Sequence, residues 1–173
     1  MSVQALHKTT TMTVRVSFVI LFCTLLLDNS SAASFEQEVL KAHNEYRARH
    51  GAAPLVLNSQ LSQLATQWAK YLMANNRMEH RQNNNYGENI YWASGGNLGG
   101  ADAVRSWYNE IKQYNWRSPS FQSNTGHFTQ VVWKGSQKLG VGFAKRGDTI
   151  FVVCNYDPPG NYMNQFQSNV SPQ

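Results

Sequence analysis

Apolar residues recur at two different spacings along the chain, and each spacing predicts one kind of element. Helical spacing, with an apolar residue every third or fourth position, follows Ser34, a good N-cap residue, and stops at Gly51 and Pro54. It returns after Asn58 or Ser59, and again over residues 101–114. The apolar faces of these three predicted helices are Phe35, Val39, Ala42 and Tyr46; Leu61, Leu64, Ala65, Trp68, Ala69 and Leu72; and Val104, Trp107, Tyr108 and Ile111.

Strand-like patterns occupy three other stretches. The segment "GENIYWA" (87–93) predicts a short strand. In "LGVGFAK" (139–145), large apolar residues alternate with glycine or alanine, which indicates that another element approaches the small face closely. In "TIFVVCNYD" (149–157) both alternating faces are apolar, as in a central strand covered on both sides. We therefore expect an α+β fold, a three-layer α-β-α sandwich, followed by a short polar, loop-like C-terminal tail.

The first 33 residues have the order of a secretory signal peptide. Lys8 and Arg15 precede an uncharged apolar run of 12 residues (16–27), and small residues follow it. The run is shorter than the roughly 18 residues expected of a membrane-spanning helix. We predict cleavage after Ala33, which leaves residues 34–173 as one domain of a secreted protein.

Charge and cysteine content narrow the function classes. The predicted mature chain has 13 Lys and Arg against 9 Asp and Glu, a net charge of +4, and its basic residues are scattered. Without basic clusters interleaved with aromatics, nucleic-acid binding is not expected, although an anionic membrane surface remains open as a partner. Cys154 is the one mature cysteine, so no intramolecular disulfide can form, and its apolar neighbours predict a buried, inert thiol.

The candidate chemistry is limited to a few histidines and acids. His43 and His50 fit packing or capping roles in the first helix, whereas His80, Glu88, Glu110 and His127 each lie at the edge of an element or in a turn. Their spacing alone predicts no metal site, because no pair lies three or four residues apart on one helix. The chain also has none of the common hydrolase or phosphate-loop motifs.

Two longer motifs carry a family resemblance. "GHFTQVVWKGS" (126–136) and "FVVCNYDPPGNY" (151–162) resemble the signature motifs of the CAP superfamily of cysteine-rich secretory, antigen 5 and pathogenesis-related type 1 proteins. The blocks "LKAHNEYRARHGAAPL", "YGENIY" and "AVRSWYNEIKQYN" are similar to family blocks in the expected order. This resemblance implies an α-β-α CAP domain with a mainly antiparallel central sheet.

The resemblance also implies a cleft lined by two histidines and two glutamates. Matched block by block, these are His80, Glu88, Glu110 and His127. His80 and His127 are the implied ligands of zinc or another divalent cation, and Glu88 and Glu110 are the candidates if the cleft is catalytic. Imidazole nitrogens suit zinc, but carboxylates can instead form ion pairs with protonated histidines.

The lack of disulfides and of a cysteine-rich extension makes the domain similar to the Golgi-associated plant pathogenesis-related subgroup, whose members bind acidic lipids. We expect a secreted, non-enzymatic module that binds lipid or sterol, with Golgi or membrane association as the alternative location. Tyr91, Trp92, Trp107 and Trp116 are candidates to line an apolar groove, or else belong to the core. A metal-assisted hydrolase, a surface-acting signalling or defence ligand and a homodimer remain open.

Overall fold

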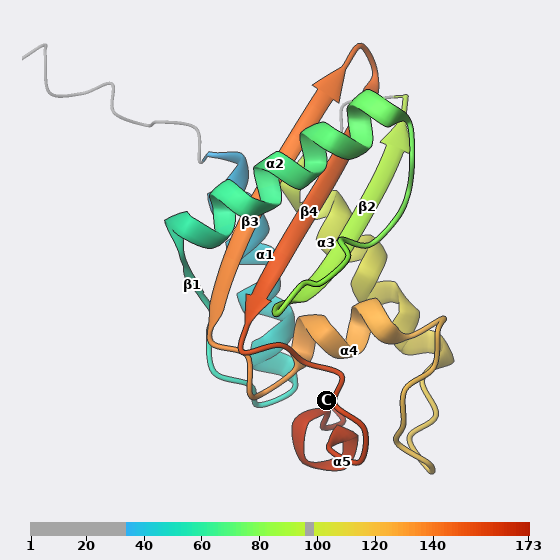
Figure 1. Ribbon diagram of the computed structural model, residues 1–173. Coiled ribbons are helices and arrows are strands. Elements are labelled where there is room, and N and C mark those ends of the chain that lie inside the picture. The colour runs from blue at the N-terminus through green and yellow to red at the C-terminus, as the bar shows by residue number, and fades with distance from the viewer. Residues whose placement is uncertain (1–33, 96–98) are drawn as a thin grey trace, which may run out of the picture. The chain divides into compact units, whose positions relative to one another are not determined.

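The computed structural model describes residues 34–95 and 99–173, which form a four-stranded sheet between two layers of helices (Figure 1). The predicted signal peptide and residues 96–98 lie outside the described residues. No helix within the described ranges is long and apolar enough to cross a membrane. The elements are α1 (Phe35–Arg49), β1 (Val56–Leu57), α2 (Ser59–Asn75), β2 (Gly87–Ser94), α3 (Gly100–Tyr108), the 3-10 helix η1 (Asn109–Gln113), α4 (Gly126–Val132), β3 (Lys138–Arg146), β4 (Thr149–Asp157) and α5 (Phe166–Asn169).

The sheet has the order β1-β3-β4-β2 and is mainly antiparallel, as expected. β4 pairs antiparallel with both β2 and β3, and only the two-residue β1 pairs parallel with β3. The predicted central strand is confirmed, because β4 is buried along residues 150–156. Cys154 lies in its middle with no exposed surface, which confirms its predicted burial, and this burial raises the pKa of its thiol.

The helices cover both faces of the sheet. α2 packs on one face, and α1, α3 and α4 lie on the other (Figure 1). The predicted close approach at the small face of β3 is confirmed, since a methyl group on Gly140 or Gly142 would collide with the backbone of α2. The predicted helix starts are confirmed too: the Ser34 side chain accepts from the Gln37 N–H, and Asn58 accepts from the Leu61 N–H.

A buried arginine ties α1 to the end of α4. Arg47 is fully buried, and its guanidinium donates to the carbonyls of Ala53, Val131, Trp133 and Ser136 at 2.8–3.1 Å. Two of these carbonyls, Val131 and Trp133, belong to the C-terminal end of α4, where carbonyls lack helical partners. Arg47 therefore fixes α4 from one end, while the candidate residue His127 lies at the other.

Two sequence predictions need correction. The helix predicted over 101–114 is α-helical only to Tyr108 and continues as η1, because Glu110 turns toward the start of α4. The C-terminal tail is not simply polar and loop-like. It forms the short helix α5, and Phe166 and Val170 are buried at 1% and 3% exposure, with Phe166 packed against Trp133. A stretch with so few apolar residues gives no periodicity to reveal such a turn.

Candidate functional site

The four predicted site residues form two histidine–glutamate pairs. His80 follows α2 in the segment before β2, and its Nδ1 lies 2.7 Å from Glu88 Oε1. His127 is the second residue of α4, and its Nδ1 lies 2.7 Å from Glu110 Oε1. A carboxylate can only accept, so each Nδ1 carries the proton, and in the neutral imidazole each Nε2 keeps a free lone pair.

The two glutamates are held differently. Glu110 Oε2 accepts from the backbone N–H groups of His127 (3.0 Å) and Phe128 (3.1 Å), so its carboxylate caps the start of α4. Glu88 Oε1 accepts from His80 and from the Arg81 N–H at 3.1 Å. Its Oε2 is buried without a hydrogen-bond partner among the described residues. Glu110 is thus fully engaged, whereas Glu88 keeps one oxygen for a donor or cation.

Strand β2 connects the two pairs. Glu88 and Asn89 are consecutive in this strand. Glu88 accepts the hydrogen bond from His80, and the Asn89 amide donates to the His127 carbonyl at 3.1 Å. Asn89 also donates to the Tyr156 hydroxyl at 3.2 Å, which fixes it in the core. Sequence spacing did not single out Asn89, because a buried amide has no signal apart from its place beside Glu88.

The two histidines differ in environment. The His80 side chain is 63% exposed, and the hydrogen bond that it donates to the Glu88 carboxylate is the main cause that raises its pKa. His127 is 31% exposed and lies over the Trp107 ring, with centroids 6.4 Å apart and planes tilted by 18°. Trp107, a candidate groove residue, is instead buried in the core and donates to the Ile90 carbonyl. His127 is therefore the more enclosed of the two.

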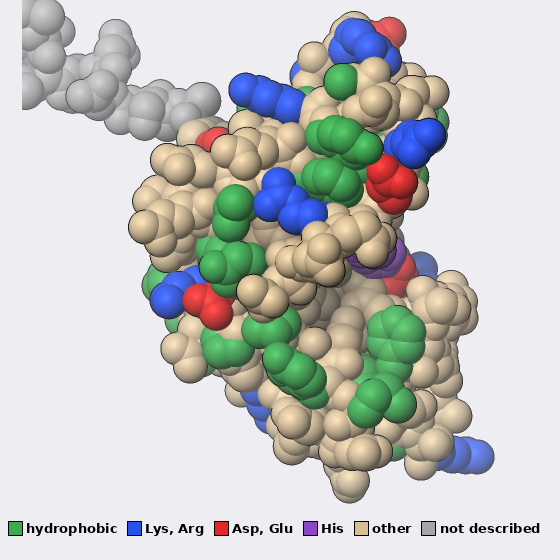
Figure 2. Space-filling model, in the orientation of Figure 1, with side chains coloured by type: hydrophobic (Ala, Val, Ile, Leu, Met, Phe, Trp, Pro, Cys, Tyr) green, Lys and Arg blue, Asp and Glu red, His purple; other side chains and the backbone are tan. Residues whose placement is uncertain are grey.

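Exposed apolar side chains lie next to the start of α4. The Phe121 ring lies 3.1 Å from the position that a Cβ on Gly126 would occupy. From the segment after β4, the Asn161 amide donates to the Gly126 carbonyl at 2.9 Å. Figure 2 shows a hollow on this face, with a histidine and an acidic side chain at its edge and hydrophobic side chains on either side. In the segment between η1 and α4 the exposed apolar residues are Trp116 and Phe121, and in the segment after β4 they are Tyr162 and Met163.

The possible cation donors in these two pairs are few. Among residues 34–95 and 99–173, no three His, Cys, Asp or Glu side chains come together as a metal-binding group. The Nε2 atoms of His80 and His127 are the neutral donors, and Glu88 Oε2, on β2, is the negatively charged one. His43 and His50 are packing groups, as expected: His43 bonds to Val39 and Tyr156, and His50 bonds to Ser171 and Tyr108.

Comparison with known proteins identifies the family. Residues 40–156 match the model of the CAP, cysteine-rich secretory protein family. The chain is 44% identical to human Golgi-associated plant pathogenesis-related protein 1 over 152 residues, covering 84% of this chain and 98% of that protein. It is 38% identical to an Arabidopsis thaliana pathogenesis-related protein 1 over 152 residues, covering 87% and 92%.

Solved structures share the fold at lower identity. A crystal structure of NaASP2 with Zn²⁺ has a TM-score of 0.65 and 23% identity, and the match covers 84% of this chain and 89% of that one. The structure of BmVAL-1 has a TM-score of 0.67 and 22% identity, with 80% and 83% covered. Motifs, fold and relatives agree, and the chain belongs to the CAP, or cysteine-rich secretory, protein family.

Proposed function

We propose that the cleft binds a divalent cation, with zinc as the best-suited ion, through Nε2 of His80 and Nε2 of His127. The observation that carries this proposal is the orientation of both imidazoles, each of which donates Nδ1–H to a glutamate. Metal-binding histidines in proteins are held in this way, because a carboxylate on one nitrogen fixes the ring and makes the other nitrogen more basic.

The arrangement predicts an open and exchangeable site. Two protein nitrogens would leave the remaining positions of a tetrahedral zinc ion to water or a ligand. Glu88 Oε2 is buried and has no hydrogen-bond partner within the described part of the chain, which supports a positive charge nearby. A bound ion would supply Lewis acidity and a position for an anionic group, while Glu110 holds α4 and His127 in place. Because Glu110 already accepts three hydrogen bonds, it is a poor general base, which disfavours the hydrolase alternative.

Isothermal titration calorimetry with zinc chloride tests the cation proposal. We expect one equivalent of zinc to bind the wild-type protein, and His80→Ala or His127→Ala to weaken binding at least about tenfold, as loss of one of two ligands should. Glu79→Ala removes an exposed acid close to His80 in sequence and should change little. Equal zinc binding by the wild type and the double histidine variant would reject the site.

The second proposed activity of this face is binding of a lipid or sterol. Apolar surface is exposed on either side of the start of α4. It comes from Phe121 in the segment before α4, and from Tyr162 and Met163 in the segment after β4. Exposed apolar side chains grouped around a hollow are typical of ligand-binding surfaces. The modest positive charge would add attraction to anionic lipid. The proposed setting is extracellular, after removal of residues 1–33.

Binding of a fluorescent sterol, and flotation with vesicles containing phosphatidylserine, would test the lipid proposal. A Phe121→Ser/Met163→Ser variant should lose most of the binding. Val56→Ser is the matched control, because Val56 is 59% exposed but lies on β1 rather than beside α4. Binding that survives in the double variant, or none in the wild type, would reject this surface as a lipid site.

A further inference from the structure

Two aromatic rings are stacked on the surface of α2, on the opposite side of the sheet from α4. The centroids of the Trp68 and Tyr71 rings lie 4.6 Å apart, and the ring planes differ by 9°. Tyr71 is 41% exposed and Trp68 is half-buried. The pair therefore forms a flat aromatic surface open to solvent, which we call the α2 platform.

The α2 platform is held in place by the segment that follows α2. The Trp68 indole N–H donates to the Glu79 carbonyl at 3.1 Å. The Arg81 guanidinium lies over the Trp68 ring, 5.4 Å from its centroid, and donates to the Leu64 carbonyl at 3.3 Å. Because these contacts orient the rings in advance, a ligand that binds here pays little for ordering them.

Arg81 brings a positive charge to the α2 platform. Within residues 34–95 and 99–173, no carboxylate oxygen lies within 4.0 Å of its guanidinium nitrogens. Figure 2 shows hydrophobic side chains over the C-terminal half of α2, with basic side chains on both sides of them. A guanidinium stacked on an indole keeps N–H groups at its edge, where a carboxylate or sulfate can accept from them.

Amide side chains supply the other polar groups near the α2 platform. They follow Tyr71 and Arg81 in the sequence, and all of them are exposed: Asn75, Asn76, Gln82 and Asn83. An amide both donates and accepts, so it can pair with the hydroxyl groups of a sugar. A flat ring with amides and an arginine around it fits a sugar with acidic groups better than it fits a lipid tail, which requires an enclosed apolar site.

We propose that the α2 platform binds an acidic oligosaccharide. The C–H face of one sugar ring packs on Tyr71, because C–H groups carry slight positive charge and the face of an aromatic ring is negative. A carboxylate of a neighbouring sugar unit accepts from the Arg81 guanidinium. This binding is separate from the proposed cation and lipid functions, although Glu88 Oε1 accepts both the Arg81 N–H and the His80 Nδ1–H.

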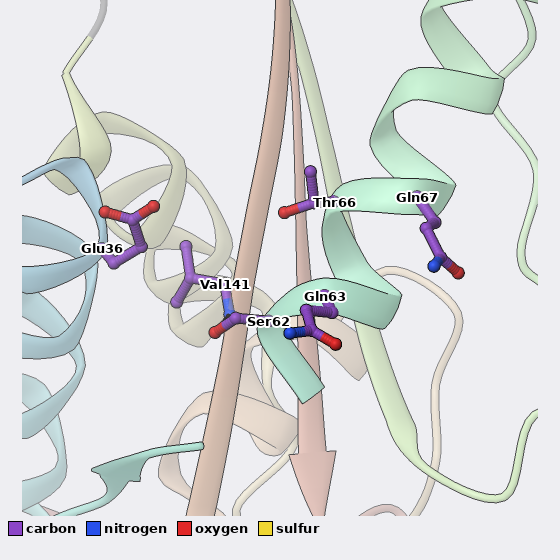
Figure 3. Close-up of a pocket in the computed structure, with 6 residues that line it drawn as sticks. All are labelled: Glu36, Ser62, Gln63, Thr66, Gln67 and Val141. Atoms are coloured by element: carbon purple, nitrogen blue, oxygen red, sulfur yellow. Dashed lines mark hydrogen bonds between the residues drawn. The ribbon is translucent and has the colours of Figure 1, made fainter. Parts of the chain in front are cut away.

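A groove on the other flank of α2 lacks this chemistry. Figure 3 shows the side chains that line it: Glu36, Ser62, Gln63, Thr66, Gln67 and Val141. None of these described residues is aromatic, and the Glu36 carboxylate would repel an acidic ligand. Thr66 therefore provides a control position on the same helix.

Isothermal titration calorimetry of the protein, expressed from its full chain, tests the proposal. Hexagalacturonate and a hyaluronate hexasaccharide are the acidic probes, and maltohexaose and chitohexaose are the neutral ones. EDTA in the buffer removes divalent cations, so the proposed cation site cannot contribute. We expect the wild type to bind an acidic probe at least about tenfold more tightly than either neutral probe, and higher salt to weaken this binding.

Variants then assign the binding to the α2 platform. Tyr71→Ala and Arg81→Gln should each weaken it at least about tenfold, whereas Tyr71→Phe, which keeps the ring, should stay within about threefold of the wild type. Thr66→Ala should leave it unchanged. Because Tyr71 is exposed, Tyr71→Ala should keep the thermal unfolding midpoint near that of the wild type, which separates lost binding from lost folding.

Three results would overturn the proposal. The first is a wild type that binds no acidic probe or binds the neutral probes equally well. The second is a Tyr71→Ala variant that folds and binds like the wild type. The third is flotation with phosphatidylserine vesicles that is lost in Tyr71→Ala while no saccharide binds, because the α2 platform would then contact a membrane surface.

Discussion

Replacing Glu110 with alanine should cost more than any ordinary surface substitution. The carboxylate accepts two backbone N–H groups at the start of α4 and the Nδ1–H of His127, at 2.7–3.1 Å. Hydrogen bonds to charged groups contribute about 1.5–3 kcal/mol each, and loss of an N-cap alone costs about 0.5–2 kcal/mol. The side chain is 22% exposed, so water can replace part of the loss. We expect the free energy of unfolding to fall by about 3 kcal/mol.

Urea denaturation followed by tryptophan fluorescence would measure this loss. Glu45→Ala is the control: Glu45 is an exposed acid 4.0 Å from Lys41, and its removal should cost less than about 0.5 kcal/mol. A loss below about 1 kcal/mol for Glu110→Ala would refute the reasoning that Glu110 holds α4.

Three other substitutions probe the scaffold by the same denaturation assay. Gly142→Ala places a methyl group against the backbone of Ala65 and Thr66 and should cost about 3 kcal/mol, whereas a smaller loss would show that α2 can shift freely. Arg47→Met leaves four carbonyls without their donor and should cost about 3–5 kcal/mol, while a near-neutral effect would contradict its role at α4. Burial is the main cause that lowers the pKa of His43 to about 4, below its unfolded value of 6.5. As pH falls below 6.5, His43 takes up a proton in the unfolded chain but stays neutral in the folded protein. The free energy of unfolding therefore decreases. The stability difference between the wild type and His43→Gln should therefore shrink by about 1.4 kcal/mol per pH unit between pH 6.5 and 4.5, and a constant difference would exclude His43 as the cause.

Much of the fold could be predicted where a periodic pattern meets a clear boundary signal. Ser34 and Asn58 mark helix starts because their side chains accept from the first helical turn. The glycines of β3 predicted the tight contact with α2 because a strand face without side chains leaves room for another backbone. β4 was identifiable as central because both of its faces are apolar.

The parts that sequence patterns missed depend on long-range contacts. η1 departs from α-helical geometry where Glu110 reaches residues 17 and 18 positions later in the chain. β1 has only two residues, too few to show an alternation. The four candidate site residues were predicted through motif similarity, because His80 and Glu88 are eight residues apart and their pairing depends on how the loop returns to β2.

In the proposed cation site, both imidazoles present Nε2 to the ion while Nδ1 stays bound to a glutamate. Long-range proton–nitrogen NMR correlation of ¹⁵N-labelled protein during a zinc titration tests it most directly. We expect the Nε2 resonances of His80 and His127 to shift together and saturate at one equivalent, while both Nδ1 atoms remain protonated. Zinc-induced shifts at Nδ1, or at neither histidine, would contradict it.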